Sequence, residues 1–99
     1  MLEINKTIQD EKACFALEGR LDTVTAPELE KELIDSIDGI KELVLDFEKL
    51  EYISSAGLRV LLAAEKKMSK AGGMKVVNVS ETIMEIFEVT GFSEMLTIE

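Results

Sequence analysis

Histidine is missing from this 99-residue sequence, and cysteine occurs only once. Without histidine the chain cannot form a Ser-His-Asp triad, use an imidazole as a general base or build the usual zinc ligand sets. The single cysteine, Cys14, cannot form a disulfide within the chain, which fits a reducing, cytoplasmic setting. Cys14 lies in an apolar run, and we expect it to be a small core residue. Aromatic residues are 5% of the chain, so aliphatic side chains must fill the core.

Long apolar runs and an excess of positive charge are also lacking. No apolar run reaches the roughly 18 residues that indicate a membrane-spanning helix, and the N-terminus has no signal-peptide pattern. The formal net charge is −9, which makes nucleic acids and anionic membrane surfaces poor partners. Two interpretations of the acidic surface stay open: it keeps the protein soluble, or it complements a basic patch on a protein partner.

Hydrophobic periodicity predicts one α/β domain. The expected strands are residues 2–8, 13–18, 41–47, 74–79 and 95–98. The expected helices lie between Thr25 and Gly39, over 55–71 and between Ser80 and Gly91. The first two strands form a hairpin with a polar turn. Strands that alternate with helices imply parallel neighbours, so the order ββαβαβαβ gives a mixed, mostly parallel sheet of about five strands.

Local signals mark where the elements begin and end. Thr25 is an N-cap candidate with Glu28 three residues on, as in a capping box, and Gly39 is the expected C-terminal cap. Gly19 is expected to end the second strand, so that residues 19–25 form a loop, and residues 48–53 are expected to form a turn. The apolar stripe of the first helix consists of Leu29, Leu33, Ile34 and Ile37.

Two adjacent hydroxyl side chains, Ser54 and Ser55, stand where the chain enters the second helix. The small residues Ala56 and Gly57 follow, so the surface there is polar and uncrowded. The N-terminus of a helix favours negative charge, because its first N–H groups lack partners and the helix dipole is positive there. The serines either cap the helix or carry a regulated charge. Gly57 allows the backbone to approach a partner or a neighbouring loop closely.

Five segments, in this order and spacing, resemble the STAS domain, the fold of bacterial anti-sigma factor antagonists. They are Gly19-Arg-Leu-Asp22, Val44-Leu-Asp-Phe47, Tyr52-Ile-Ser-Ser-Ala-Gly-Leu58, Ala71-Gly-Gly73 and Val89-Thr-Gly-Phe92. The resemblance spans essentially the whole chain, residues 1–99, as one STAS domain. It implies helices packed chiefly on one face of the sheet.

The resemblance also implies a mechanism. In that family the central motif is typically Asp-Ser-X-Gly-Leu, with Ser, Thr or Ala at X, and a partner phosphorylates its serine. Matching Gly57-Leu58 to the motif implies phosphorylation at Ser55, while Ser54 stands where many members have aspartate. The unphosphorylated chain would bind an anti-sigma factor that is also a serine kinase, and a phosphatase would reset it. The resemblance also implies that this chain is not an enzyme and uses no cofactor or metal. The implied partner-binding surface is Asp22, Thr23, Ser54, Ser55, Ala56, Gly57, Leu58 and Arg59.

An alternative within the family is a STAS subunit of another complex, such as a lipid-transport ATPase or a signalling assembly, with an unswitched interface. Ser55 and the short chain favour the antagonist. An enzyme is disfavoured, because the sequence has no Walker A motif, no Gly-rich dinucleotide motif and no metal cluster. Asp22 and Asp46 either tune the phosphate acceptor or are ordinary loop and strand-end residues. Arg59 is either solvated or contacts a phosphate on Ser55.

Overall fold

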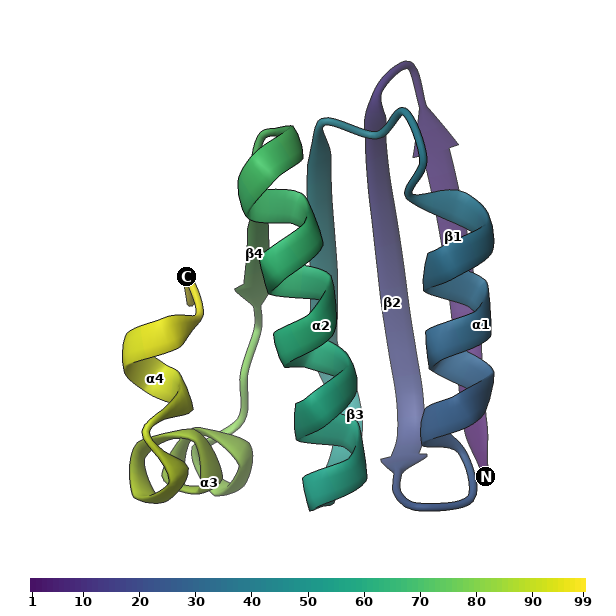
Figure 1. Cartoon of the computed structure of the whole chain (residues 1–99). Coiled ribbons are helices and arrows are strands. Elements are labelled where there is room, and N and C mark those ends of the chain that lie inside the picture. The colour runs from purple at the N-terminus through teal and green to yellow at the C-terminus, as the bar shows by residue number, and fades with distance from the viewer.

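A four-stranded sheet with the order β1-β2-β3-β4 forms the frame of the protein. The computed structural model describes all residues 1–99. The strands are β1 (Leu2–Gln9), β2 (Lys12–Leu21), β3 (Glu42–Ile53) and β4 (Met74–Val77); the helices are α1 (Ala26–Ser36), α2 (Ser55–Ala71), α3 (Glu81–Thr90) and α4 (Phe92–Met95). Figure 1 shows α1 and α2 side by side over one face of the sheet, with α3 and α4 beyond β4.

The pairing of the strands confirms a mixed, mostly parallel α/β sheet. β1 and β2 form an antiparallel hairpin, in which Leu2 pairs with Gly19 and Gln9 with Lys12. β2 and β3 are parallel, and so are β3 and β4. The connections between these parallel neighbours contain α1 and α2. As a result, the loops that follow β2 and β3 lie at the same edge of the sheet, at the bottom of Figure 1.

The core lies between the sheet and the helices α1 and α2, and Ile83 and Phe87 of α3 extend it. Alternate residues of β2 and β3 are fully buried, among them Phe15 and Leu45. Cys14 is partly exposed, because it alternates with these buried residues and faces the other side of the sheet. The prediction of a core cysteine is therefore wrong. Ile34 was predicted to belong to the apolar stripe of α1, but it is 58% exposed, so it does not lie on the buried face of the helix and that part of the prediction is wrong.

Both central strands are longer than the sequence pattern predicts. β2 continues past Gly19, where the chain has φ +107° and an added Cβ would lie 2.3 Å from the Met1 carbonyl oxygen. The parallel pairing of β2 with β3 shifts register twice in this region. These irregularities keep Leu21 opposite Ile53, so residues 48–53 continue β3 instead of forming a turn. Pairing with a neighbouring strand thus overrides the local breaker signal.

The ends of α1 and of the chain also differ from the predictions. α1 ends at Ser36, with Ile37 as its C-cap, and Gly39 follows in the next turn at φ +82°. The predicted fifth strand is absent, because the residues after Gly91 form the short helix α4. Only one parallel bridge, from Ile98 to Val76, joins this end to the sheet. None of the helices combines the length and apolar character needed to cross a membrane.

Candidate functional site

The turn from β3 into α2 is built around Ser54. This residue is the N-cap of α2, with extended backbone, and its side-chain oxygen accepts a hydrogen bond from the Gly57 N–H at 3.4 Å. The Ser54 N–H donates to the Leu21 carbonyl at 2.9 Å, which ties the turn to the end of β2. The predicted cap at Ser54 is confirmed, and so are the predicted bounds of α2.

Ser55 is the first residue of α2, and its side chain is exposed. Its hydroxyl makes no hydrogen bond within the protein, because the capping bond is already made by Ser54. The free N–H groups of the first helical turn and the positive end of the helix dipole lie beside it. The Ser55 hydroxyl is therefore available to solvent, in a place that stabilises added negative charge.

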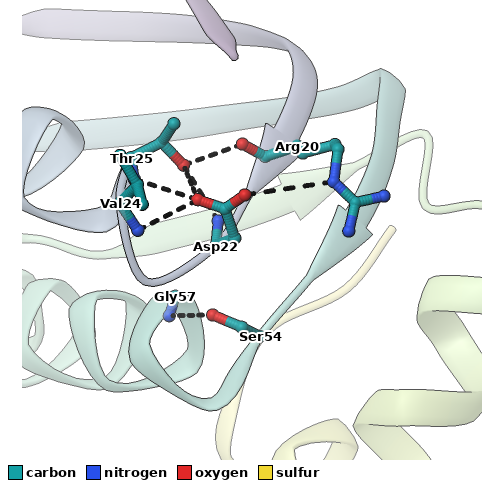
Figure 2. A network of polar contacts seen from close by, with 6 residues as sticks. All are labelled: Arg20, Asp22, Val24, Thr25, Ser54 and Gly57. Atoms are coloured by element: carbon teal, nitrogen blue, oxygen red, sulfur yellow. Dashed lines mark hydrogen bonds and ion pairs between the residues drawn. The ribbon is translucent and has the colours of Figure 1, made fainter.

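The loop between β2 and α1 is held by Asp22 and Thr25 (Figure 2). One carboxylate oxygen of Asp22, Oδ1, accepts hydrogen bonds from the N–H groups of Val24 and Thr25, each at 3.0 Å. The Thr25 hydroxyl donates to the Arg20 carbonyl at 2.8 Å and accepts from the Asp22 N–H at 2.9 Å. The hydrogen bonds that the N–H groups of Thr25 and Val24 donate to the Asp22 carboxylate lower its pKa.

These contacts correct the prediction that the Thr25 side chain caps α1. Thr25 does occupy the N-cap position, but it has helical backbone and makes no side-chain capping bond. It is 3% exposed, and its hydroxyl stays inside the loop. The Asp22 carboxylate also has its hydrogen bonds within the loop, apart from a loose approach of 3.9 Å by Arg20 Nε. Asp22 therefore orders this loop.

A second exposed feature, Arg20 stacked on Tyr52, lies at the same edge of the sheet. Arg20 on β2 pairs with Tyr52 on β3, and the guanidinium carbon lies 4.3 Å from the centre of the ring. This pair was not predicted, because the sequence pattern placed both residues in loops. Val24, which is 79% exposed, was not among the predicted surface residues either. The signal for Val24 was an aliphatic residue inside an otherwise polar loop sequence.

Only some residues of the predicted partner-binding surface lie together and are exposed. The two loops that hold Asp22, Thr23, Ser54 and Ser55 lie at one edge of the sheet, outside the carboxyl ends of β2 and β3, where ligands of open α/β sheets commonly bind. Ala56 is half-buried and Arg59 is exposed. Gly57 and Leu58 are buried, so they support the serine turn from inside.

Asp46 lies away from this edge. Its carboxylate accepts hydrogen bonds from the Glu48 N–H at 3.0 Å and from the Asn78 side chain at 3.1 Å. It pairs with Ala16 in the sheet, and about 25 Å of strand separates it from Ser54. Asp46 therefore holds the start of the β4–α3 connection and does not contact the serines. No group of three or more acidic, cysteine or histidine side chains is arranged to bind a metal ion.

Comparisons with known proteins identify the fold family. The STAS domain family matches residues 3–99. BtrV of Bordetella bronchiseptica, named as an anti-sigma factor antagonist, is 37% identical over 84 residues, which cover 83% of this chain and 72% of BtrV. The anti-sigma-B factor antagonist of Staphylococcus aureus is 29% identical over 99 residues, 98% of this chain and 92% of that protein.

Solved structures agree with these relatives. An anti-sigma factor antagonist from Mycobacterium paratuberculosis superimposes with a TM-score of 0.88 at 26% identity, over 99% of this chain and 85% of that chain. The unphosphorylated form of SpoIIAA has the same fold, with a TM-score of 0.76 at 18% identity, over 100% of this chain and 87% of that chain. The phosphorylated form of SpoIIAA from Bacillus superimposes with a TM-score of 0.75 at 19% identity, over 100% of this chain and 91% of that chain. The profile match, the relatives and the sheet topology together establish that this chain belongs to the STAS domain family.

Proposed function

We propose that this chain is an anti-sigma factor antagonist that binds a serine-kinase anti-sigma factor, and that phosphorylation at Ser55 ends the binding. The observation that carries the proposal is the free Ser55 hydroxyl on a turn that Ser54 already caps. The relatives named as anti-sigma factor antagonists support the choice of partner. The chain then works by binding, without a cofactor, in the cytoplasm where sigma factors act.

The geometry supports phosphorylation of Ser55 without loss of the fold. A phosphoserine adds about −1.5 to −2 charges and three acceptor oxygens, and the first turn of α2 stabilises negative charge. The capping bond from Gly57 to Ser54 does not involve Ser55, so a phosphate there breaks no hydrogen bond of the turn. The SpoIIAA structures, with and without phosphate, indicate that this fold accommodates the modification.

The phosphate then acts on the partner. Its bulk, its charge and the cost of removing water from it all oppose a protein surface that covers Ser55. A loss of ~3–4 kcal/mol of binding free energy weakens an interface by several hundred-fold, which is enough for a switch. A phosphatase that removes the phosphate restores binding.

Two measurements test the proposal, each with a candidate anti-sigma factor purified from the source organism. In the first, incubation with ATP should transfer phosphate to the wild type and to Ser54→Ala, and none to Ser55→Ala. In the second, a binding titration should give Ser55→Ala the wild-type affinity and weaken Ser55→Asp by about 100-fold or more. Ser80→Asp is the matched control, because Ser80 caps α3 and aspartate caps as well as serine.

The outcomes separate the proposal from an unswitched interface. Strong binding without phosphate uptake, and equal affinities of Ser55→Ala and Ser55→Asp, would identify a constitutive STAS subunit. Equal weakening by Ser80→Asp and Ser55→Asp would mean that the negative charge acts through the overall charge of the protein and not through the serine turn.

A further inference from the structure

The loop between β2 and α1 holds an aliphatic side chain, Val24, out in water beside the serine turn. We propose that Val24 is the apolar anchor of the partner-binding surface, and that it fills an apolar recess on the anti-sigma factor. This inference rests on the proposed function and adds a residue that determines affinity beside the switch residue Ser55.

The exposure of Val24 is fixed by its neighbours. Its N–H group donates to the Asp22 carboxylate, and the next residue, Thr25, is buried and bonded to Arg20 and Asp22. These bonds order the backbone on both sides of Val24, yet the side chain remains 79% exposed. Valine has one rotatable and stiff side-chain bond, so on an ordered backbone it loses little conformational entropy when a partner covers it, which favours its use as an anchor.

The position of Val24 puts it within the footprint of a partner of typical size that is centred on Ser55. The hydrogen bond from the Ser54 N–H to the Leu21 carbonyl joins the two loops. Val24 follows Leu21 by three residues, which span at most about 10 Å of chain. A typical protein interface buries about 800 Å² on each partner and is therefore roughly 30 Å across. A partner centred on Ser55 thus also covers Val24.

The surface around Val24 has the composition of an interface centre. The stacked pair of Arg20 and Tyr52 lies at the same edge, and arginine and tyrosine are enriched among the residues that dominate binding. Hydrogen bonds within the loop satisfy the Asp22 carboxylate and the Thr25 hydroxyl, so covering them leaves few unpaired polar groups. An apolar recess on the partner gains affinity from Val24, and a phosphate on Ser55 opposes the same contact.

Three variants test the anchor, titrated by calorimetry against the anti-sigma factor that phosphorylates the wild type. Val24→Ser should raise the Kd about tenfold, because burial of a valine contributes roughly this factor or more. Val24→Ile keeps an aliphatic side chain and should stay within about threefold of the wild type. Val89→Ser is the matched control: Val89 on α3 is 87% exposed, and α3 lies on the far side of α2 from the Val24 loop (Figure 1).

The results distinguish failure of the anchor from failure of the proposed function. If the wild type binds and Ser55→Asp does not, but Val24→Ser keeps the wild-type Kd, the anchor is wrong and the switch stands. If Val89→Ser weakens binding as much as Val24→Ser, the loss does not depend on this loop and the anchor is again wrong. If the unphosphorylated wild type binds no anti-sigma factor, the proposed function fails, and the anchor fails with it. Because Val24 and Val89 are both exposed, all three variants should keep the wild-type Tm.

Discussion

Substitution of Gly57, the glycine of the serine turn, by alanine has two opposing effects on the stability of the fold. A Cβ added at this position would lie 2.7 Å from Leu21 Cγ and 2.9 Å from Ile53 Cγ1. Carbon atoms in contact prefer about 3.5–4.0 Å, so each contact is short by roughly 1 Å. Leu21 is 0% exposed and Ile53 2% exposed, and neither side chain can move into solvent. Gly57→Ala therefore overpacks the core below the turn.

The favourable effect of the substitution is smaller. Alanine is better than glycine inside a helix by about 1 kcal/mol, and less in the first turn, where Gly57 lies. Overpacking of a dense core typically costs about 1–3 kcal/mol. We expect Gly57→Ala to lower the free energy of unfolding by ~1–2 kcal/mol. For a domain of this size that lowers the Tm by about 5–15 °C, measured by circular dichroism at pH 7.

A double-mutant cycle locates the cause. Leu21→Ala removes the atom closest to the added Cβ and destabilises the protein by itself, by about 2–5 kcal/mol. In that background Gly57→Ala should cost at least ~1 kcal/mol less than in the wild type, because the space is then free. A wild-type or higher Tm for Gly57→Ala alone would refute the reasoning, and so would equal losses in the two backgrounds.

Two further predictions concern the Asp22–Thr25 loop. The lowered pKa of Asp22 means that its carboxylate stabilises the fold above the unfolded pKa of about 4, and that this stabilisation is lost as the pH falls through the folded value. The Tm advantage of the wild type over Asp22→Asn should thus be full at pH 6 and shrink below about pH 4; a pH-independent difference would contradict it. Thr25→Val should lower the free energy of unfolding, measured by urea denaturation, by about 1–3 kcal/mol, because the Asp22 N–H and the Arg20 carbonyl lose a buried partner. The control Thr23→Val, at an exposed position, should change the free energy of unfolding little.

The elements that were predicted correctly are those that local chemistry determines. Ser54 caps α2 and Ser80 caps α3 because a serine side chain can accept from the first-turn N–H groups wherever the rest of the chain lies. Gly91 ends α3 because its positive φ, +83°, suits a glycine. The initial hairpin and the parallel pairing of the later strands were also predicted correctly, since alternating strands and helices leave few topologies.

The wrong predictions concern residues whose conformation or contacts are determined by a segment distant in the sequence. Gly19 is a breaker by itself, but β1 and β3 on either side keep it in the sheet. Thr25 had the sequence of a capping box, yet its hydroxyl finds the Arg20 carbonyl at the end of the preceding strand. Tyr52 and Arg20 are 32 residues apart and meet only through the register of β2 and β3. The serine turn was therefore predictable, and the surface that surrounds it was not.

Ser54 itself offers a last prediction, because many family members have aspartate where this chain has serine. The capping bond from the Gly57 N–H is 3.4 Å long, which is beyond the usual range of about 2.7–3.2 Å. A carboxylate reaches further, accepts more strongly and interacts with the helix dipole, for a gain of about 0.3–1 kcal/mol. Ser54→Asp should therefore raise the Tm by about 2–6 °C, whereas Ser54→Ala should lower it.

The same substitution tests whether the proposed switch at Ser55 responds to the position of a negative charge or only to its presence. The Ser54→Asp carboxylate faces the Gly57 N–H group, while the Ser55 side chain is exposed on the first turn. In a titration against the anti-sigma factor, Ser54→Asp should therefore weaken binding far less than Ser55→Asp, although the two variants have the same net charge. Equal weakening would mean that the partner responds to any negative charge at the turn, and a lower Tm for Ser54→Asp would show that the cap does not accept a carboxylate.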